Sequence, residues 1–213
     1  MERVSDPLTG LLTSAEFHHD IEALIVKSTP FAYILMDMDG LLAINSDFGH
    51  EIGDEVFRLV ARHIKTVFTP PNGTYRQGGD SFCMLMPDTS KEEAFLKAEY
   101  VRRLIADDVL TTPDGRTVNQ TVSIGVSSFP EDGSRTADIY RRAESAMVRA
   151  KKAGRNQVCL AREEKLIPKT SHYTQTQLEK LSVTAEKLGV GEAALLRESL
   201  DDLLKKYEVD WVK

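Results

Sequence analysis

The sequence predicts a mixed α/β domain, in which helices surround a sheet of parallel and antiparallel strands, followed by a helical tail. Three observations support this fold class. Apolar residues at helical spacing alternate along the chain with short apolar runs that are typical of buried strands. The pair Gly78-Gly79 lies between two such runs and marks a hairpin. The composition changes near residues 163–165, so we expect one domain over residues 1–163 and a helical tail over residues 164–213.

Each element of the first domain has its own signal. Helices are predicted where capping residues or glycines flank apolar residues that recur three and four positions apart. Strands are predicted at the apolar runs between them. Two predicted helices follow the capping boxes Thr13-x-x-Glu16 and Ser90-x-x-Glu93, and a third follows Gly53-Asp54. A fourth covers Thr136–Lys152 and is ended by Gly154. The predicted strands are Phe31–Met36, the two strands of the Gly-Gly hairpin, Val118–Val126 and Val158–Leu160.

The tail is predicted to hold two short amphipathic helices. The first follows the capping box Thr174-x-x-Gln177 and stops at Gly189, and the second begins near Glu192. Leucines recur on one face of each helix. Because two short helices cannot bury such faces alone, we expect the tail to pack on the main domain or on a partner copy in a homodimer.

The composition narrows the class of protein. The chain has 27 Lys and Arg against 33 Asp and Glu, and its formal net charge of −6 argues against a broad nucleic-acid surface. Cys83 and Cys159 lie in apolar segments and are predicted to be buried free thiols. No apolar stretch approaches the ~20 residues that a membrane span needs, and the N-terminus lacks the apolar core of a signal peptide. We therefore expect a soluble cytoplasmic protein with no membrane partner.

Acidic side chains close two neighbouring predicted strands. Asp37 and Asp39 end one apolar run, and Asp80 lies in the hairpin turn. Carboxylates on adjacent strand ends are suited to a site for Mg²⁺ and a nucleoside triphosphate. Ser81 places a hydroxyl where such a site could use a second hairpin carboxylate, which argues against full catalytic activity.

The spacing of six motifs resembles that of the GGDEF domain, the diguanylate cyclase family. Each motif alone is weakly specific, but their order and spacing over residues 6–160 make a chance match very improbable. The matching pieces are Asp6-Pro-Leu-Thr-Gly-Leu11, Met36-Asp-Met-Asp39, Asn45-Ser-Asp-Phe-Gly-His-Glu-Ile-Gly-Asp54, Arg76-Gln-Gly-Gly-Asp-Ser-Phe82, Val122-Ser-Ile-Gly-Val126 and Ala150-Lys-Lys-Ala-Gly-Arg-Asn156.

The resemblance implies a five-stranded sheet wrapped by helices, related to the adenylyl cyclase and polymerase palm. It also implies one Mg·GTP, or Mn·GTP, per protomer, and two protomers that join two GTP molecules into cyclic di-GMP. Asp37 matches the metal carboxylate, with the Met38 carbonyl as a second ligand, and the alternative is an ordinary acid at a surface strand end. Asp80 matches an acid that binds metal and helps to deprotonate the attacking ribose hydroxyl, and the alternative is an ordinary aspartate in a turn. Asp39 is predicted to have a supporting or salt-bridge role.

The resemblance also implies nucleotide contacts. Asn45 and Asp54 match the residues that read the guanine edge, and the alternative for both is an ordinary role in a helix. His50 supports this loop, lies near the ribose, or is purely structural. Lys151 and Arg155 match the phosphate-contacting cations, and the alternative is that they are charges at a helix C-terminus.

The sequence departs from the family pattern at several positions. Ser81 replaces a glutamate that ligates metal, so we expect weak metal binding and slow or absent chemistry. The segment Gly40-Leu41-Leu42-Ala43 lacks a phosphate-binding lysine. Thr69 and Asn72 replace the Arg and Asp of the product-inhibition site. These departures predict a degenerate member that binds GTP or a related guanine nucleotide as a sensor or regulator. The alternative is an active but slow cyclase.

The tail weakly resembles a ribbon-helix-helix module, a small dimeric DNA-binding fold. The strand of that module would be Lys169–Tyr173, with Thr174 as the helix cap. Residues 164–213 contain seven Lys and one Arg against nine acidic residues, a net charge of −1. Because phosphate contacts need cations, a DNA-binding regulator is not favoured. We expect instead a tail for dimerisation, for packing, or for a protein partner.

Overall fold

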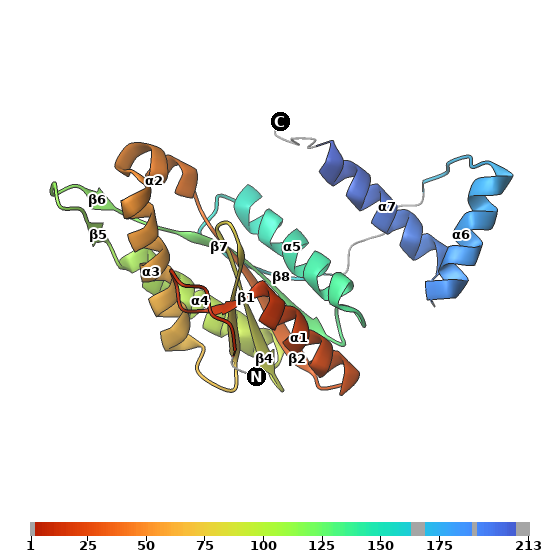
Figure 1. The fold of residues 1–213 in the computed structure, drawn as a ribbon, viewed down its shortest axis with the longest axis horizontal. Coiled ribbons are helices and arrows are strands. Elements are labelled where there is room, and N and C mark those ends of the chain that lie inside the picture. The colour runs from red at the N-terminus through yellow and green to blue at the C-terminus, as the bar shows by residue number, and fades with distance from the viewer. Residues whose placement is uncertain (1–2, 163–168, 189–190, 208–213) are drawn as a thin grey trace. The chain divides into compact units, whose positions relative to one another are not determined.

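We describe residues 3–162, 169–188 and 191–207 of a computed structural model of the chain. The chain divides into two compact units, Met1–Glu164 and Lys165–Lys213 (Figure 1). The first unit is a mixed α/β domain, as the sequence predicts, and the second is a pair of helices.

One mixed sheet forms the centre of the first unit. The central strand β2 runs antiparallel to both of its neighbours, whereas the pairs β1–β3 and β7–β8 are parallel. The sheet has six strands rather than the five that the resemblance implies, because Leu12–Thr13 pairs with Tyr75–Arg76 at one edge. In sheet order the strands are β1 (Leu12–Thr13), β3 (Gly73–Gly78), β4 (Ser81–Pro87), β2 (Phe31–Met38), β7 (Val122–Phe129) and β8 (Val158–Leu160).

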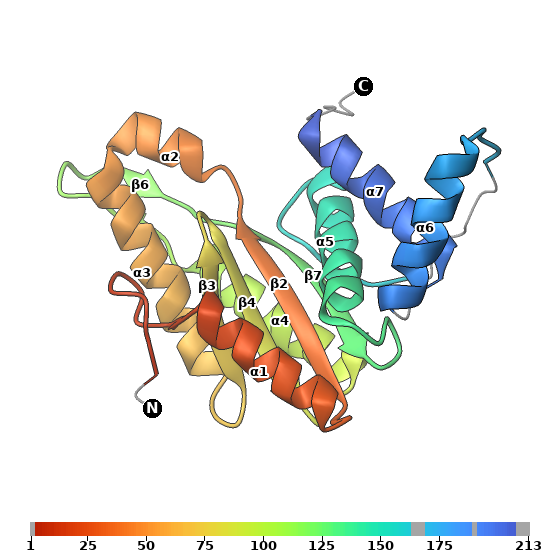
Figure 2. The same ribbon diagram turned by 45° about the vertical axis from the view of Figure 1, so that its right-hand side comes forward.

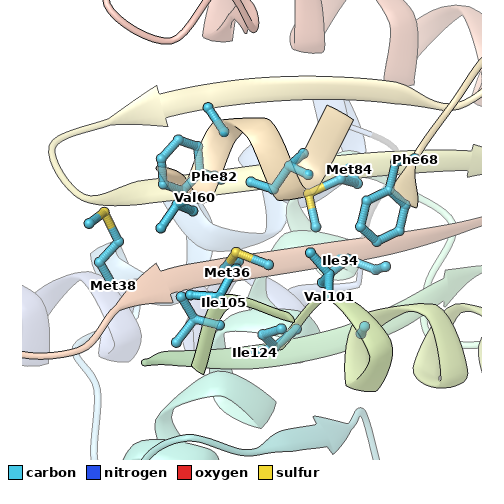
Figure 3. Close-up of a cluster of buried hydrophobic side chains, with 14 of the residues drawn as sticks. Ile34, Met36, Met38, Val60, Phe68, Phe82, Met84, Val101, Ile105 and Ile124 are labelled. Carbon is cyan, nitrogen blue, oxygen red and sulfur yellow. The ribbon is translucent and has the colours of Figure 1, made fainter. Parts of the chain in front are cut away.

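Helices cover both faces of this sheet because alternate residues of each strand point to opposite sides. On one face, Ile34, Met36 and Met38 of β2 join a core under α3 (His50–Val67) and α4 (Lys91–Asp107) (Figure 3). On the other face, strand residues pack under α1 (Ser14–Val26) and α5 (Thr136–Lys152). Figure 2 shows α1 crossing in front of β2 and β4, with α4 on the far side. A shorter helix, α2 (Leu41–Phe48), follows β2.

Several predicted boundaries are wrong by a few residues. Strand β2 continues past Met36 to Met38, so Asp37 is hydrogen-bonded into the sheet on both sides. Helix α3 begins at His50 rather than after Gly53. The bounds Thr136–Lys152 of α5 and Val158–Leu160 of β8 are as predicted.

The predicted strand Val118–Val126 is two separate elements. Strand β6 (Thr117–Val118) pairs with β5 (Leu110–Thr111) in a small hairpin, and β7 begins only at Val122. Between them, the buried amide of Gln120 donates a 3.0 Å hydrogen bond to the carbonyl oxygen of Asp39. This hydrogen bond to a distant segment lies where the strand pairing is interrupted between Val118 and Val122. Alternating hydrophobicity in the sequence does not reveal such a long-range bond.

The capping predictions have different outcomes. Ser90 Oγ accepts a 3.1 Å hydrogen bond from the N–H of Glu93, which confirms the cap of α4. In the described part of the chain no hydrogen bond from the Thr13 side chain caps α1. The reciprocal bond of the box is absent as well, because the Thr13 N–H donates to the Val4 carbonyl oxygen and the Glu16 carboxylate accepts from Arg3 and from the Val4 N–H.

The second unit consists of α6 (Gln175–Leu188) and α7 (Glu192–Lys206). The reciprocal bonds of the predicted box are present, since Thr174 N donates to Gln177 Oε1 at 2.9 Å and Gln177 N to Thr174 Oγ1 at 3.3 Å. The predicted stop at Gly189 lies outside the described residues. The predicted strand Lys169–Tyr173 is irregular here.

Two further predictions concern the whole chain. Both cysteines are free thiols, but only Cys83 is buried, and Cys159 is partly exposed. Among the residues described, no helix is both long enough and apolar enough to cross a bilayer.

Candidate functional site

The ends of three strands bring polar side chains together on one face of the sheet. Asp37 of β2 pairs in register with Ser81 of β4 on one side and with Ser123 of β7 on the other. Directly opposed residues of antiparallel strands point to the same face. Here that face is the one that α5 covers, so the end of α5 lies over this row.

Asp37 is the buried centre of this group, with 8% of its surface exposed. Its Oδ1 forms a 2.7 Å ion pair with Lys151 Nζ, and its Oδ2 accepts a 3.4 Å hydrogen bond from Ser81 Oγ. Burial raises the pKa of Asp37, and the Lys151 ammonium opposes that rise. The predicted metal carboxylate and the predicted phosphate lysine therefore contact each other directly.

The hairpin turn is attached to the end of β2. The backbone N–H of Met38 donates a 3.2 Å hydrogen bond to the carbonyl oxygen of Asp80, while the Met38 side chain is buried in the core. The Asp80 carboxylate is partly exposed and has no hydrogen bond or ion pair with any described residue. It is therefore free to act on a ligand.

Asp39 has a supporting role, through hydrogen bonds rather than through a salt bridge. Its carboxylate accepts hydrogen bonds from Thr121 Oγ1 at 2.9 Å, Ser123 Oγ at 2.7 Å and the backbone N–H of Asn156 at 3.1 Å. Sequence reasoning missed all three donors. Ser123 and Asn156 had a signal, since each lies in a matching motif, whereas Thr121 had none. Asp39 thus joins the ends of β2 and β7 to the loop after α5.

A second group of predicted residues lies where α2 meets α3. Asn45 is partly buried, and its side chain lies against Gly53 so closely that a Cβ added at Gly53 would be 2.0 Å from Asn45 Oδ1. His50 and Asp54 are exposed in the first turns of α3, which follow the turn at Gly49. Backbone N–H groups at such an N-terminus attract negative charge. No hydrogen bond or ion pair between described residues joins this group to Asp37 or Asp80.

The predicted phosphate cations lie at the C-terminal end of α5. Lys151 is in the last turn of the helix, and Arg155 follows it with a left-handed backbone, φ 63°. The Arg155 side chain is exposed and has no hydrogen bond or ion pair within the described ranges. The structure therefore brings Lys151 to the acidic strand end, whereas the Arg155 side chain is exposed to solvent.

Sequence reasoning also missed what holds the hairpin. The Arg76 guanidinium contacts both carboxylate oxygens of Asp6 at 3.2 Å, donates to the Gly79 carbonyl oxygen at 3.2 Å and lies 4.3 Å above the Phe57 ring. Burial raises the pKa of Asp6, but hydrogen bonds from Thr9 and Arg76 outweigh it and lower that pKa below its usual range. The N-terminal segment thus anchors the Gly-Gly turn.

The donor set fits a divalent cation poorly. One oxygen of Asp37 is paired with Lys151, and the Asp39 carboxylate already accepts three hydrogen bonds. Ser81 adds a neutral hydroxyl instead of an acid. Within the described ranges no three His, Cys, Asp or Glu side chains are grouped as metal ligands. Asp80 is the carboxylate of this group that remains unengaged.

Comparison with known families identifies both parts of the chain. The family model described as diguanylate cyclase, GGDEF domain, matches residues 3–157, and a ribbon-helix-helix domain model matches residues 165–208. Both resemblances found in the sequence are thereby confirmed.

Curated relatives match the first unit. The response regulator PleD of Caulobacter vibrioides is 34% identical over 160 residues, which cover 73% of this chain and 35% of the relative. A diguanylate cyclase of Vibrio cholerae is 31% identical over 163 residues, which cover 75% of this chain and 50% of the relative. The chain spans between about a third and half of the length of these two curated relatives.

Solved structures match in fold. The GGDEF domain of DgcB from Caulobacter crescentus, in complex with c-di-GMP, has a TM-score of 0.69 at 26% identity, covering 76% of this chain and 97% of that one. The active GGEEF domain of a diguanylate cyclase from Vibrio cholerae has a TM-score of 0.63 at 31% identity, covering 70% of this chain and 94% of that one.

Proposed function

This chain belongs to the GGDEF family of diguanylate cyclases, and we propose that it binds GTP or a related guanine nucleotide as a sensor, with little or no cyclase activity. The observation that carries the proposal is the contact between Asp37 and Ser81. An acid is paired in register with a hydroxyl at the position where the family has a second acid.

The residues for nucleotide recognition are present. Asn45 offers a donor and an acceptor, and the Asp54 carboxylate accepts from the N–H groups of a guanine edge. Lys151 and Arg155 supply the cations that phosphate oxygens need. His50, exposed at the start of α3, is a further candidate contact to the nucleotide.

The residues for chemistry are incomplete. Deprotonation of a ribose hydroxyl needs a well-placed base or a metal that lowers the hydroxyl pKa. Asp80 is unengaged within the described residues and is the candidate base. Because Asp37 is occupied and Ser81 is neutral, Mg²⁺ or Mn²⁺ binds weakly if at all, and the alternative of an active enzyme is restricted to slow turnover.

The test combines binding and product formation. Native protein and Ser81→Glu are titrated with GTP by calorimetry and then incubated with GTP and Mg²⁺ or Mn²⁺ for chromatography of cyclic di-GMP. We expect GTP binding by both proteins and product only from Ser81→Glu. Ser134→Glu, which adds the same charge at an exposed loop position, is the control and is expected to form no product.

Two outcomes would contradict the proposal. Native protein that fails to bind GTP would remove the sensor function. Native protein that forms cyclic di-GMP would show that Asp37 and Asp80 suffice, and the chain would then be a slow cyclase.

The tail supports a second function, homodimerisation. Residues 165–208 match a ribbon-helix-helix model, a fold whose strand needs a partner strand, and Lys169–Tyr173 is unpaired here. The leucines Leu178, Leu200 and Leu203 are also about half exposed. Sedimentation tests this: we expect a dimer that Leu200→Asp weakens, whereas a monomeric native chain would contradict it.

The same tail has two other candidate partners. A protein partner would bind the exposed leucine faces, and DNA would bind a ribbon-helix-helix dimer. The net charge of −1 over residues 164–213 disfavours DNA. Salt-sensitive binding of duplex DNA by the full chain would overturn that preference.

A further inference from the structure

We propose that the nucleotide site works without a divalent cation, because the Lys151 ammonium takes the place of the metal beside Asp37. This inference rests on the proposed function and concerns the same site. It predicts that the ligand is a metal-free guanine nucleotide, whereas the family pattern implies a metal–nucleotide complex.

The first argument is the occupancy of Asp37. Lys151 Nζ lies 2.7 Å from Oδ1, and Ser81 Oγ lies 3.4 Å from Oδ2, so both carboxylate oxygens have partners within the protein. A cation that approached Asp37 would have to displace a charge-assisted hydrogen bond at a side chain that is only 11% exposed. Hard divalent ions need several oxygen ligands to repay such a displacement.

The second argument is the balance of charge. A group of unpaired carboxylates repels phosphate unless a cation neutralises it. In this chain Asp37 is neutralised by Lys151, and Asp39 is stabilised by three hydrogen-bond donors. The carboxylate of Asp80 remains without a partner among the described residues, and the exposed Arg155 guanidinium is a further cation that a phosphate can contact. The negative charge that these carboxylates would otherwise offer to a metal is therefore partly offset by the chain's own cations and donors.

The third argument is the geometry of the ammonium. Lys151 has three N–H donors, and the described structure assigns one of them to Asp37. Its side chain is 35% exposed, so the other two donors can reach phosphate oxygens from the solvent side. Lys151 therefore pairs with Asp37 through one N–H and keeps two N–H donors for a ligand.

Ser81 is the residue that makes this arrangement favourable. A glutamate at this position would add a second carboxylate opposite Asp37 in the β2–β4 register. One ammonium could not neutralise both acids, and a divalent cation would then be favoured. We therefore expect Ser81→Glu to convert the site from metal-independent to metal-dependent nucleotide binding.

The experiment measures binding of GTP and GDP by calorimetry, once in EDTA and once in millimolar Mg²⁺. For the native chain, we expect affinities that differ by less than about threefold between the two conditions, because no metal ligand is gained or lost. For Ser81→Glu, we expect binding to be at least about tenfold weaker in EDTA than in Mg²⁺.

A lysine pair provides the matched control. Lys151→Met should weaken binding in EDTA by about tenfold or more, since the site loses its internal cation. Lys152→Met removes the same charge from the next, exposed position of α5 and should leave binding unchanged. Thermal unfolding of each variant checks that the fold is retained.

The outcomes separate this inference from the proposed function. If the native chain binds in Mg²⁺ but not in EDTA, the metal-independent site is wrong while the nucleotide sensor stands. If it binds in neither condition, both proposals fail. Equal weakening by Lys151→Met and Lys152→Met would also overturn the role of Lys151.

Discussion

Asp39 and Asn156 are 117 positions apart in the sequence, and the backbone N–H of Asn156 donates a 3.1 Å hydrogen bond to Asp39 Oδ2. Through this bond the end of β2 holds the loop that follows α5. Asn156 adopts a left-handed conformation, φ 47°, and its side chain accepts a 2.8 Å bond from Arg102 of α4. Three elements therefore converge beside the residues that carry the proposed site.

Asp39→Ala should destabilise the domain without removing a ligand contact. Three donors would lose their acceptor, and we expect the free energy of unfolding to fall by about 2–3 kcal/mol. Urea denaturation measures this change. Asp80→Ala is the control, since its carboxylate has no partner among the described residues, and its effect should stay within about 0.5 kcal/mol. Equal effects of the two variants would refute the supporting role of Asp39.

Gly53→Ala should alter base recognition more than stability. The added Cβ would meet Asn45 Oδ1 at 2.0 Å, and a side-chain amide can move away from it. Because Asn45 would then leave its position, we expect GTP binding to weaken by about tenfold, with a smaller change for ATP. Competition binding measures both. Gly191→Ala, where an added Cβ meets nothing within 4 Å, is the control. Unchanged GTP preference in Gly53→Ala would count against Asn45 as a guanine contact.

Gly125→Ala should be severely destabilising. A Cβ on Gly125 of β7 would lie 1.9 Å from the carbonyl oxygen of Ala143 and 2.6 Å from the backbone N of Met147, both in α5. Because backbone atoms cannot move aside separately, we expect a loss of at least about 3 kcal/mol in the free energy of unfolding.

A nearby serine provides the comparison for Gly125. Ser127→Ala removes one 2.9 Å hydrogen bond to the Ile139 carbonyl oxygen from the same strand, at an expected cost of about 1 kcal/mol. Both variants are measured by urea denaturation. A Gly125→Ala protein as stable as Ser127→Ala would show that α5 can shift away from the sheet.

Acid should weaken the anchor between Asp6 and Arg76. The pKa of Asp6 is lower in the folded protein than in the unfolded chain, so its contribution to stability is complete above the unfolded value of about 3.9. That contribution disappears as the pH falls through the lower, folded value. Urea midpoints measured from neutral to strongly acidic pH should therefore converge for native protein and Asp6→Asn. A difference that persists at the lowest pH would contradict this linkage.

Local signals in the sequence were sufficient for much of the fold. The bounds Thr136–Lys152 were predicted because the apolar spacing, the basic last turn and the glycine after it all lie within one segment. The capping box at Thr174 and the cap at Ser90 were also predicted, because the residues that bond to each other there are only three positions apart in the sequence. The break at Gln120 was missed because its cause, a bond to Asp39, comes from a segment far away in the sequence.

For the candidate site, too, the sequence predicted some features and the tertiary structure was needed for others. The sequence by itself determined the family and the presence of Ser81 at the signature position, and it supplied the residues that we propose for guanine and phosphate contacts. Only the tertiary structure decided that Lys151 contacts Asp37 and that Asp39 is committed to Thr121, Ser123 and Asn156. An ion pair between a strand and a helix depends on how closely the two pack, and here Gly125 lets α5 approach β7 closely enough to bring its last turn to the strand end.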